Sequence, residues 1–381
     1  MSYIDKKHLT LIAMLIFLSF LGLFWLCIVV LIVALLYRGV NYIKHKFIRK
    51  TANVLFSFLM LLFLAIGVRV FIVDIYLIPS SSMENTLYPK DVILVNKLKY
   101  GPILPQSPYD IPLLNIFYYL KNSSEKAVKE KVWDYNRLSG TGSIKQGDVI
   151  VFKNREIMVK RCVAIAGDTL RIVGGEVYIN DVFNKSPKHV KNNYVFKLKN
   201  VRHFYSAIDT LEIKSHVASI KDNGRKQANL SYVEAEQIRR LNCIDSLSIK
   251  IADAPIRAKM FPWYKEKQWT LDNYGPIVIP KKGMEIQLNH DSYQLYKYIF
   301  KTYENLDIEE QNNLFFKDGK PISSYIFKKN YYFMMGDHRK DSRDSRYMGF
   351  IPEENIIGKV SCVLFSNKDN EFQWNRLFKS I

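Results

Sequence analysis

The first 75 residues of the chain contain two long apolar runs. Leu9–Tyr37 carries no charged residue and exceeds the roughly 20 residues that a helix needs to cross a bilayer. A second run, from Thr51 to Val73, is interrupted only by Arg69, whose long side chain can extend to the membrane surface. The sequence therefore predicts a membrane anchor over residues 1–75, with transmembrane helices at about 9–37 and 52–73.

The segment between the two runs predicts the orientation of this anchor. Residues 38–50 read RGVNYIKHKFIRK, a short basic stretch that should stay in the cytoplasm because positively charged loops are retained there. Everything after Asp74 then lies on the exoplasmic side. A cleavable secretory signal is the alternative for residues 9–37, but the run is too long for such a signal and a second span follows directly.

Charge and cysteine content limit the possible partners. The net charge of +19 favours an acidic partner, and beside two spans we expect anionic membrane lipid rather than nucleic acid, for which no reader module is found. Cys162, Cys243 and Cys362 show no CxxC spacing, so a zinc site is not expected. Buried thiols are favoured, although one disulfide among the three remains open.

The rest of the chain reads as a mostly β catalytic domain over residues 76–180 and 331–381. Gly174-Gly175 predicts a tight hairpin turn inside TLRIVGGEVYIN (169–180). Short runs rich in β-branched or aromatic residues predict further strands at 92–95, 148–152, 157–163, 331–335 and 359–365. Residues 181–330 are rich in Lys and Asn, with amphipathic helices expected at Tyr232–Leu241 and His290–Tyr303, and predict a large α+β insertion.

Two residues in the β domain suggest nucleophilic catalysis. Ser82 follows Val73 by nine residues, so it can lie no more than about 30 Å from the membrane. Lys160 has apolar neighbours along its strand, and desolvation there should lower the pKa of its amine. A neutral amine can take the proton of a serine hydroxyl. Without Ser82, a lysine reaching water at a sheet edge would be the better interpretation.

Three sequence segments, taken together, resemble one enzyme family. PSSSM (79–83) resembles the PSxSM signature of bacterial type I signal peptidases, also called leader peptidases, which use a Ser/Lys dyad. GDVIVF, then VKR with a downstream GD, then GDHRKDSRDSRYMGFIP (336–352) follow in the order of that family. The similarity covers roughly residues 66–101, 147–180 and 331–365.

This resemblance implies a role for each matching residue. Ser82 would be the nucleophile and Lys160 its general base, while the Ser82 N–H and the Ser80 hydroxyl would form the oxyanion hole. In the GDHR segment, Ser342 would position the Lys160 amine, and Asp344 and Arg346 would support the site. The resemblance implies no metal or organic cofactor.

The same resemblance implies a substrate and a location. The enzyme would remove N-terminal signal peptides from secreted preproteins, as a multi-pass protein of the bacterial plasma (inner) membrane with its catalytic domain on the periplasmic side. Asn85 stands where the family commonly has Pro, and His338 where it commonly has Asn. The long insertion leaves the substrate range open. The competing interpretation is a catalytically inactive membrane scaffold whose insertion binds a partner.

Overall fold

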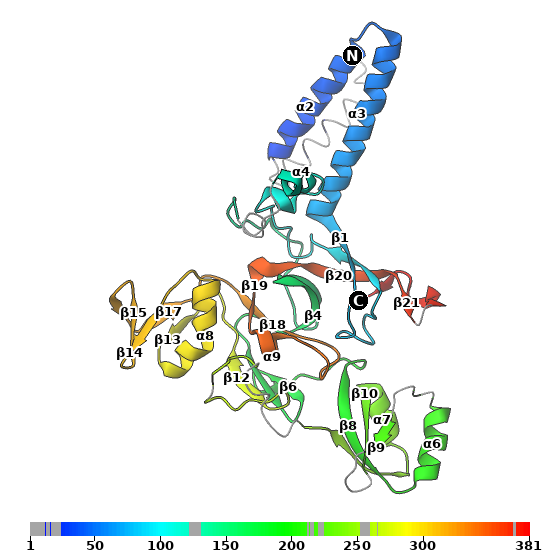
Figure 1. Cartoon of the computed structure of the whole chain (residues 1–381), viewed down its shortest axis with the longest axis vertical. Coiled ribbons are helices and arrows are strands. Elements are labelled where there is room, and N and C mark those ends of the chain that lie inside the picture. The colour runs from blue at the N-terminus through cyan, green and yellow to red at the C-terminus, as the bar shows by residue number, and fades with distance from the viewer. Residues whose placement is uncertain are drawn as a thin grey trace. The chain divides into compact units, whose positions relative to one another are not determined.

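The structure, a computed structural model, describes residues 12, 16, 24–121, 131–211, 213, 217–219, 225–251, 260–264, 266–368 and 371–381. These residues form two compact units, Met1–Arg69 and Val70–Ile381 (Figure 1). Thirteen residues of the first apolar run, all between 9 and 23, lie outside the described residues.

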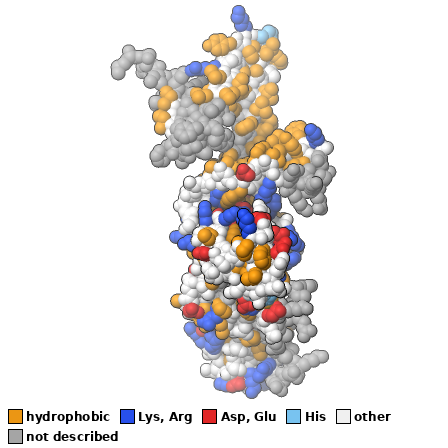
Figure 2. Space-filling model, turned by 90° about the vertical axis from the view of Figure 1, so that its left-hand side faces the viewer, with side chains coloured by type: hydrophobic (Ala, Val, Ile, Leu, Met, Phe, Trp, Pro, Cys, Tyr) orange, Lys and Arg blue, Asp and Glu red, His pale blue; other side chains and the backbone are white. Residues whose placement is uncertain are grey.

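Among the described residues of the first unit, Phe24–Asn41 forms α2 and Lys46–Gly67 forms α3, which continues into a π-helical turn at Val68–Ile72. Lys46–Ile72 is long and apolar enough to cross a membrane and is the one such helix among the described residues. It begins six residues before the expected span, because lysine and arginine favour helices and the basic residues from Lys46 to Lys50 form its first turn. Hydrophobic side chains cover the described surface of this unit (Figure 2). The two-span topology and its sidedness remain predictions.

The second unit is built on an antiparallel sheet that brings distant parts of the sequence together. Its strand order is β1-β2-β20-β3-β4-β18-β19, with β23 also paired to β20. Hydrophobic side chains from its two faces enter separate cores, as when Val149 and Val151 face one core and Ile150 and Phe152 the other. The strands are β1 (Val73–Leu77), β2 (Val92–Asn96), β3 (Val149–Asn154), β4 (Glu156–Ala164), β18 (Tyr331–Met335), β19 (Ile351–Pro352), β20 (Ile356–Phe365) and β23 (Lys379–Ser380).

The predicted glycine hairpin is confirmed and belongs to a second sheet. β5 (Thr169–Val173) and β6 (Glu176–Ile179) pair across Gly174 and Gly175, both at positive φ as a two-residue hairpin turn requires. The sheet order is β12-β5-β6-β7, with β7 at Val182–Phe183 and β12 at Tyr274–Val278. Residues far along the chain therefore complete the sheet that the hairpin begins.

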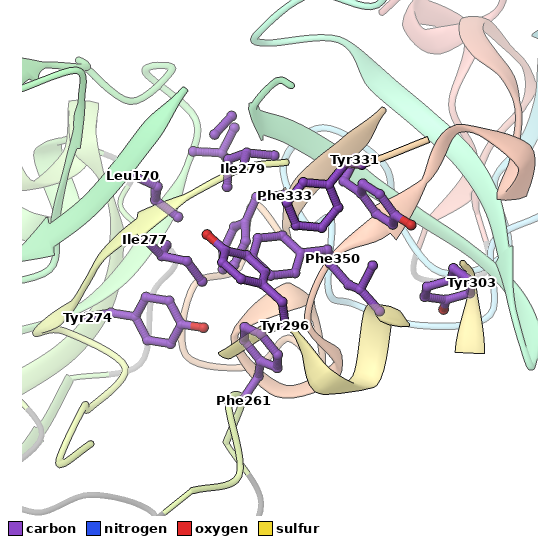
Figure 3. Close-up of a cluster of buried hydrophobic side chains, with 14 of the residues drawn as sticks. Leu170, Phe261, Tyr274, Ile277, Ile279, Tyr296, Tyr303, Tyr331, Phe333 and Phe350 are labelled. Atoms are coloured by element: carbon purple, nitrogen blue, oxygen red, sulfur yellow. The ribbon is translucent and has the colours of Figure 1, made fainter. Parts of the chain in front are cut away.

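An aromatic core joins this second sheet to the main sheet. Tyr274 on β12, Tyr296 on α8 (His290–Thr302), Phe333 on β18 and Phe350 lie together in it (Figure 3). Large aromatic rings contribute most of the buried apolar area of such a core. Around it lie the small sheets β13-β17 (Glu285–Gln287, Ser324–Ile326) and β14-β15-β16 (Glu309–Gln311, Leu314–Lys317, Lys320–Ile322).

A further sheet has a core of its own, in which Phe196, Phe204 and Ile238 are among the buried residues. Its order is β11-β8-β10-β9, and α6 and α7 contribute to its core. The expected segment 181–330 thus supplies side chains to two different cores. The elements are β8 (Lys191–Leu198), α6 (Val201–Thr210), β9 (Val217–Ser219), β10 (Arg225–Ser231), α7 (Tyr232–Arg239) and β11 (Ile244–Ile249).

The five predicted strands outside the hairpin are confirmed as β2, β3, β4, β18 and β20, and the two predicted helices as α7 and α8. Cys162, Cys243 and Cys362 are free thiols, the first two buried. The remaining short elements are α4 (Leu114–Lys121), α9 (Ser345–Met348), the pair β21-β22 (Asn367–Lys368, Glu371–Phe372) and the 3-10 turns Pro108–Asp110, Glu353–Asn355 and Trp374–Arg376.

Candidate active site

The segment that carries Ser82 is pinned to the main sheet on both sides. Before the serine, the Ile78 N–H donates to the Asp91 carbonyl at 2.8 Å, and the Lys90 N–H donates to the Ile78 carbonyl at 2.8 Å. After it, Met83 is buried in the core that the sheet covers. The side chain that follows the serine therefore anchors the turn, and Ser82 itself is buried.

Lys160 reaches Ser82 from β4. Its Nζ lies 2.6 Å from Ser82 Oγ and donates to the Val159 carbonyl at 3.0 Å. The lysine is only 4% exposed, and this burial lowers the pKa of its amine below the ordinary value, against the opposing effect of Asp344 and Asp337. β4 thus places an amine of lowered pKa within hydrogen-bond distance of a serine hydroxyl.

Two hydrogen-bond donors lie close to the Ser82 side chain. The Ser80 hydroxyl is 3.3 Å from Ser82 Oγ. The Ser82 N–H donates to no described residue. Such donors can stabilise the negative charge that develops on a carbonyl oxygen when Ser82 Oγ attacks that carbonyl.

The GDHR segment (336–352) contacts the backbone of Ser82. The His338 N–H donates to the Ser82 carbonyl at 3.0 Å. A β-carbon on Gly336 would lie 2.6 Å from that same carbonyl oxygen and would collide with the Ser342 side chain, so only glycine fits there. The serine backbone is therefore fixed by close packing as well as by a hydrogen bond.

Asp344 and Arg346 form a fully buried pair at the end of this segment. Arg346 donates to the two carboxylate oxygens of Asp344 at 2.9 and 2.8 Å and to the Arg339 carbonyl at 2.6 Å, while the Gly336 N–H donates to Asp344 at 3.0 Å. Burial works against a charged carboxylate, but Arg346 outweighs it and the pKa of Asp344 lies below its usual value. The pair therefore fixes the conformation of the GDHR segment, which contacts Ser82.

Ser342 is placed differently from Asp344 and Arg346. It is buried beside Gly336, and its hydroxyl makes no hydrogen bond of ordinary geometry with a described residue, but it lies near Asp344 and helps to lower the pKa of that carboxyl. The hydrogen bonds of Lys160 go to Ser82 and Val159, not to Ser342. No hydrogen bond between Ser342 and Lys160 therefore supports the role expected for Ser342, positioning the Lys160 amine.

No metal site is found among the described residues, where no group of three or more His, Cys, Asp or Glu side chains could hold an ion.

Comparison with known proteins identifies the family of the chain. The sequence model of the family described as signal peptidase, peptidase S26, matches residues 51–237 and 273–365, well over half of the chain. The chain belongs to this signal peptidase family. It is therefore a serine endopeptidase.

Several curated relatives cover most of the chain. A signal peptidase I from Buchnera aphidicola subsp. Baizongia pistaciae is 26% identical over 339 residues, 87% of this chain and 82% of that protein. One from Helicobacter pylori J99 is 23% identical over 356 residues, 88% of this chain and 95% of that protein. A crystal structure of a signal peptidase I from Enterococcus faecalis V583 is 13% identical and covers 57% of this chain and 97% of that chain, at a TM-score of 0.22, too low for the two folds to be compared.

Among residues that sequence reasoning left without a role, Arg161 and Asp337 connect the dyad to its supports. Arg161 follows Lys160 on β4 and donates to both Asp337 oxygens, at 2.8 and 2.6 Å. Thr86, four residues after Ser82, also donates to Asp337. Burial opposes ionisation of Asp337, but Arg161 lowers its pKa nonetheless. The VKR and GD motifs already contained both residues, so their signal was present in the sequence.

The sheet containing β8 also contacts this network. The Lys191 N–H donates to the Asp337 carbonyl at 2.8 Å, and the Arg339 N–H donates to the Lys191 carbonyl at 3.0 Å. The side chain of Asn229 on β10 meets the His338 ring. No motif marked Lys191 or Asn229, because both lie in the segment without a recognisable pattern.

Proposed function

We propose that this chain is a membrane-bound signal peptidase I that removes N-terminal signal peptides from secreted preproteins through a Ser82 acyl-enzyme. The observation that carries the proposal is the 2.6 Å separation of Lys160 Nζ and Ser82 Oγ at a buried site. The signal peptidases among its relatives favour the same substrate class.

The chemistry follows from these groups. A neutral Lys160 amine takes the proton of the Ser82 hydroxyl as its oxygen attacks the scissile carbonyl. The Ser82 N–H and the Ser80 hydroxyl stabilise the oxyanion, and the Lys160 ammonium then gives its proton to the leaving amine of the mature protein. Water, activated in the same way by Lys160, hydrolyses the ester and frees the signal peptide.

The location proposed is the bacterial plasma (inner) membrane. Lys46–Ile72 supports an anchor by its length and apolar character. The preprotein, held in the bilayer by its own apolar segment, presents its cleavage site just above the outer surface, so preproteins and membrane lipid are the expected partners. A second span before Lys46 and an exoplasmic catalytic domain complete the proposed topology.

Cleavage of a purified preprotein tests the proposal. The full chain in detergent is incubated with a preprotein carrying an Ala-x-Ala site, beside the variants Ser82→Ala and Lys160→Ala, and the new N-terminus is sequenced. We expect a cut after the second Ala, no turnover for Ser82→Ala, and a loss of about 10² to 10⁴-fold for Lys160→Ala.

The proposal predicts a clear contrast with the scaffold alternative. An intact preprotein beside folded wild-type chain would favour a catalytically inactive scaffold. Near-normal cleavage by Lys160→Ala would remove the dyad mechanism while leaving a peptidase. A Lys153→Ala variant, which changes an exposed lysine on neighbouring β3, should behave as wild type.

A further inference from the structure

A cavity of about 830 Å³ lies next to the dyad without containing it. Its walls come from the turn between β3 and β4, from residues Lys340 to Arg343 of the GDHR segment, and from Trp263 and Tyr298. This volume lies within the range of pockets that bind ligands in proteins.

Two walls of the cavity lead directly to the catalytic residues. Met158 on the β4 wall stands two residues before Lys160. On the other wall, the Ser81 hydroxyl, next to the nucleophile, donates to Asp341 at 2.9 Å. A chain bound at Ser82 can therefore continue into the cavity without a long detour.

Some of the charged side chains that line the cavity have an interaction partner and others do not. Lys340 is paired with Asp272, and Asp341 accepts the hydrogen bond of Ser81. Arg155 and Arg343 are exposed, and neither forms an ion pair with any residue in the described part of the chain. Arg155 also holds a left-handed backbone, at φ 60°, in the β3–β4 turn. Against these two cations, Glu156 is the one lining carboxylate that no described residue binds.

We propose that this cavity binds the segment of the preprotein that follows the scissile bond, and that Arg343 and Arg155 favour an acidic residue there. The inference rests on the proposed function. A charged cavity suits the polar start of a mature protein and not the apolar core of a signal peptide. Within the main sheet, β4 also lies four strands away from β1, the strand that continues from the membrane helix.

Aromatic side chains supply the rest of the recognition surface. Trp263 is 41% exposed, and its ring packs edge-on against Tyr298 at 5.2 Å between centroids. An aromatic pair that lines a pocket can cover an extended peptide backbone with little loss of side-chain freedom. Both residues lie within the expected insertion, residues 181–330.

Paired substrates test the inference on the full chain in detergent. Two preproteins, identical through an Ala-x-Ala site, carry either Glu or Lys at the second and third residues after it, and kcat/KM is measured for each. We expect wild type to prefer the Glu preprotein about two- to five-fold, as exposed ion pairs allow. Arg343→Glu should abolish or invert this preference, and Arg343→Lys should retain it.

Lys317→Glu is the matched control, because it makes the same charge change on β15 outside the cavity. Equal wild-type rates for the two preproteins, or an equal loss of preference in Lys317→Glu, would overturn the inference while the peptidase remains. Failure of wild type to cut either preprotein, or cutting by Ser82→Ala, would instead contradict the proposed function.

Discussion

The amine of Lys160 can act as a base only in molecules in which it carries no proton. Two opposing effects decide that fraction. Burial disfavours the ammonium, whereas the carboxylates of Asp344 and Asp337 favour it, and burial prevails. The ion pairs of those carboxylates with Arg346 and Arg161 matter for this balance, because each neighbouring guanidinium offsets the carboxylate charge that Lys160 experiences.

The first prediction concerns pH. Cleavage should rise with pH through the lowered pKa of Lys160, on the acid side of the ordinary lysine value of 10.5. Between these two pKa values the unfolded chain binds more protons, so the stability contribution of Lys160 also rises with pH. A pH profile of kcat/KM checks this, with Lys153→Arg as control. Lys160→Arg should be inactive throughout, and a rising limb that persists in it would assign the titration to another group.

The second prediction concerns Asn85, whose backbone has φ 71°. Proline is locked near −65°, so Asn85→Pro should lower the free energy of unfolding by more than about 1 kcal/mol. Asn85→Gly keeps the left-handed backbone and loses only the 3.2 Å hydrogen bond to the His189 carbonyl. Urea unfolding of wild type and both variants in detergent measures the difference. Equal stability of the two would refute the backbone argument.

At the scale of elements, β8 is hydrogen-bonded to the GDHR segment that contacts Ser82. Its first residue, Lys191, exchanges backbone hydrogen bonds with Asp337 and Arg339, on either side of the His338 N–H that holds Ser82. The segment beyond the hairpin therefore reaches Ser82 through one intermediate residue, His338. This coupling is specific to backbone geometry, since the hydrogen bonds involve main-chain atoms.

Lys191→Pro tests this coupling, because proline removes the N–H and is tolerated at the first position of a strand. An unpaired Asp337 carbonyl should cost about 1–3 kcal/mol of stability and lower kcat more than it changes KM. Lys191→Ala is the control, since it loses only the 3.3 Å ion pair with Glu84. Unfolding curves and the kcat and KM of both variants are compared. Unchanged kcat in a destabilised Lys191→Pro would mean that β8 has a structural role only.

Local sequence patterns predicted individual elements better than their partners. The period-2 apolar runs and Gly174-Gly175 were sufficient for β2 to β6, β18 and β20, because these signals act over a few residues. The pairing of β12 with β5, and the aromatic core around Tyr296, depend on contacts across about a hundred residues. Lys160 and Ser82 could be paired from sequence only because family motifs marked them both.

At the scale of the whole molecule, function depends on where the catalytic unit stands relative to the bilayer. The basic residues of the anchor are unevenly distributed: five of its eight Lys and Arg residues, Arg38, Lys44, Lys46, Arg49 and Lys50, fall within residues 38–50. Moving such a cluster across the membrane is unfavourable, so it should stay in the cytoplasm. A peptidase acting on secreted preproteins then needs everything after Asp74 outside.

Introduced cysteines test this orientation in spheroplasts. In a Cys27→Ser/Cys362→Ser background, in which the two remaining native thiols, Cys162 and Cys243, are buried, His45→Cys and Lys317→Cys are labelled with a membrane-impermeant maleimide. We expect Lys317→Cys to react at once and His45→Cys to react only after permeabilisation, because the basic segment lies inside. The reverse pattern would place the catalytic unit in the cytoplasm, where it could not meet exported cleavage sites. Labelling of both in intact spheroplasts would leave the segment 38–50 outside as well and would contradict the two-span anchor.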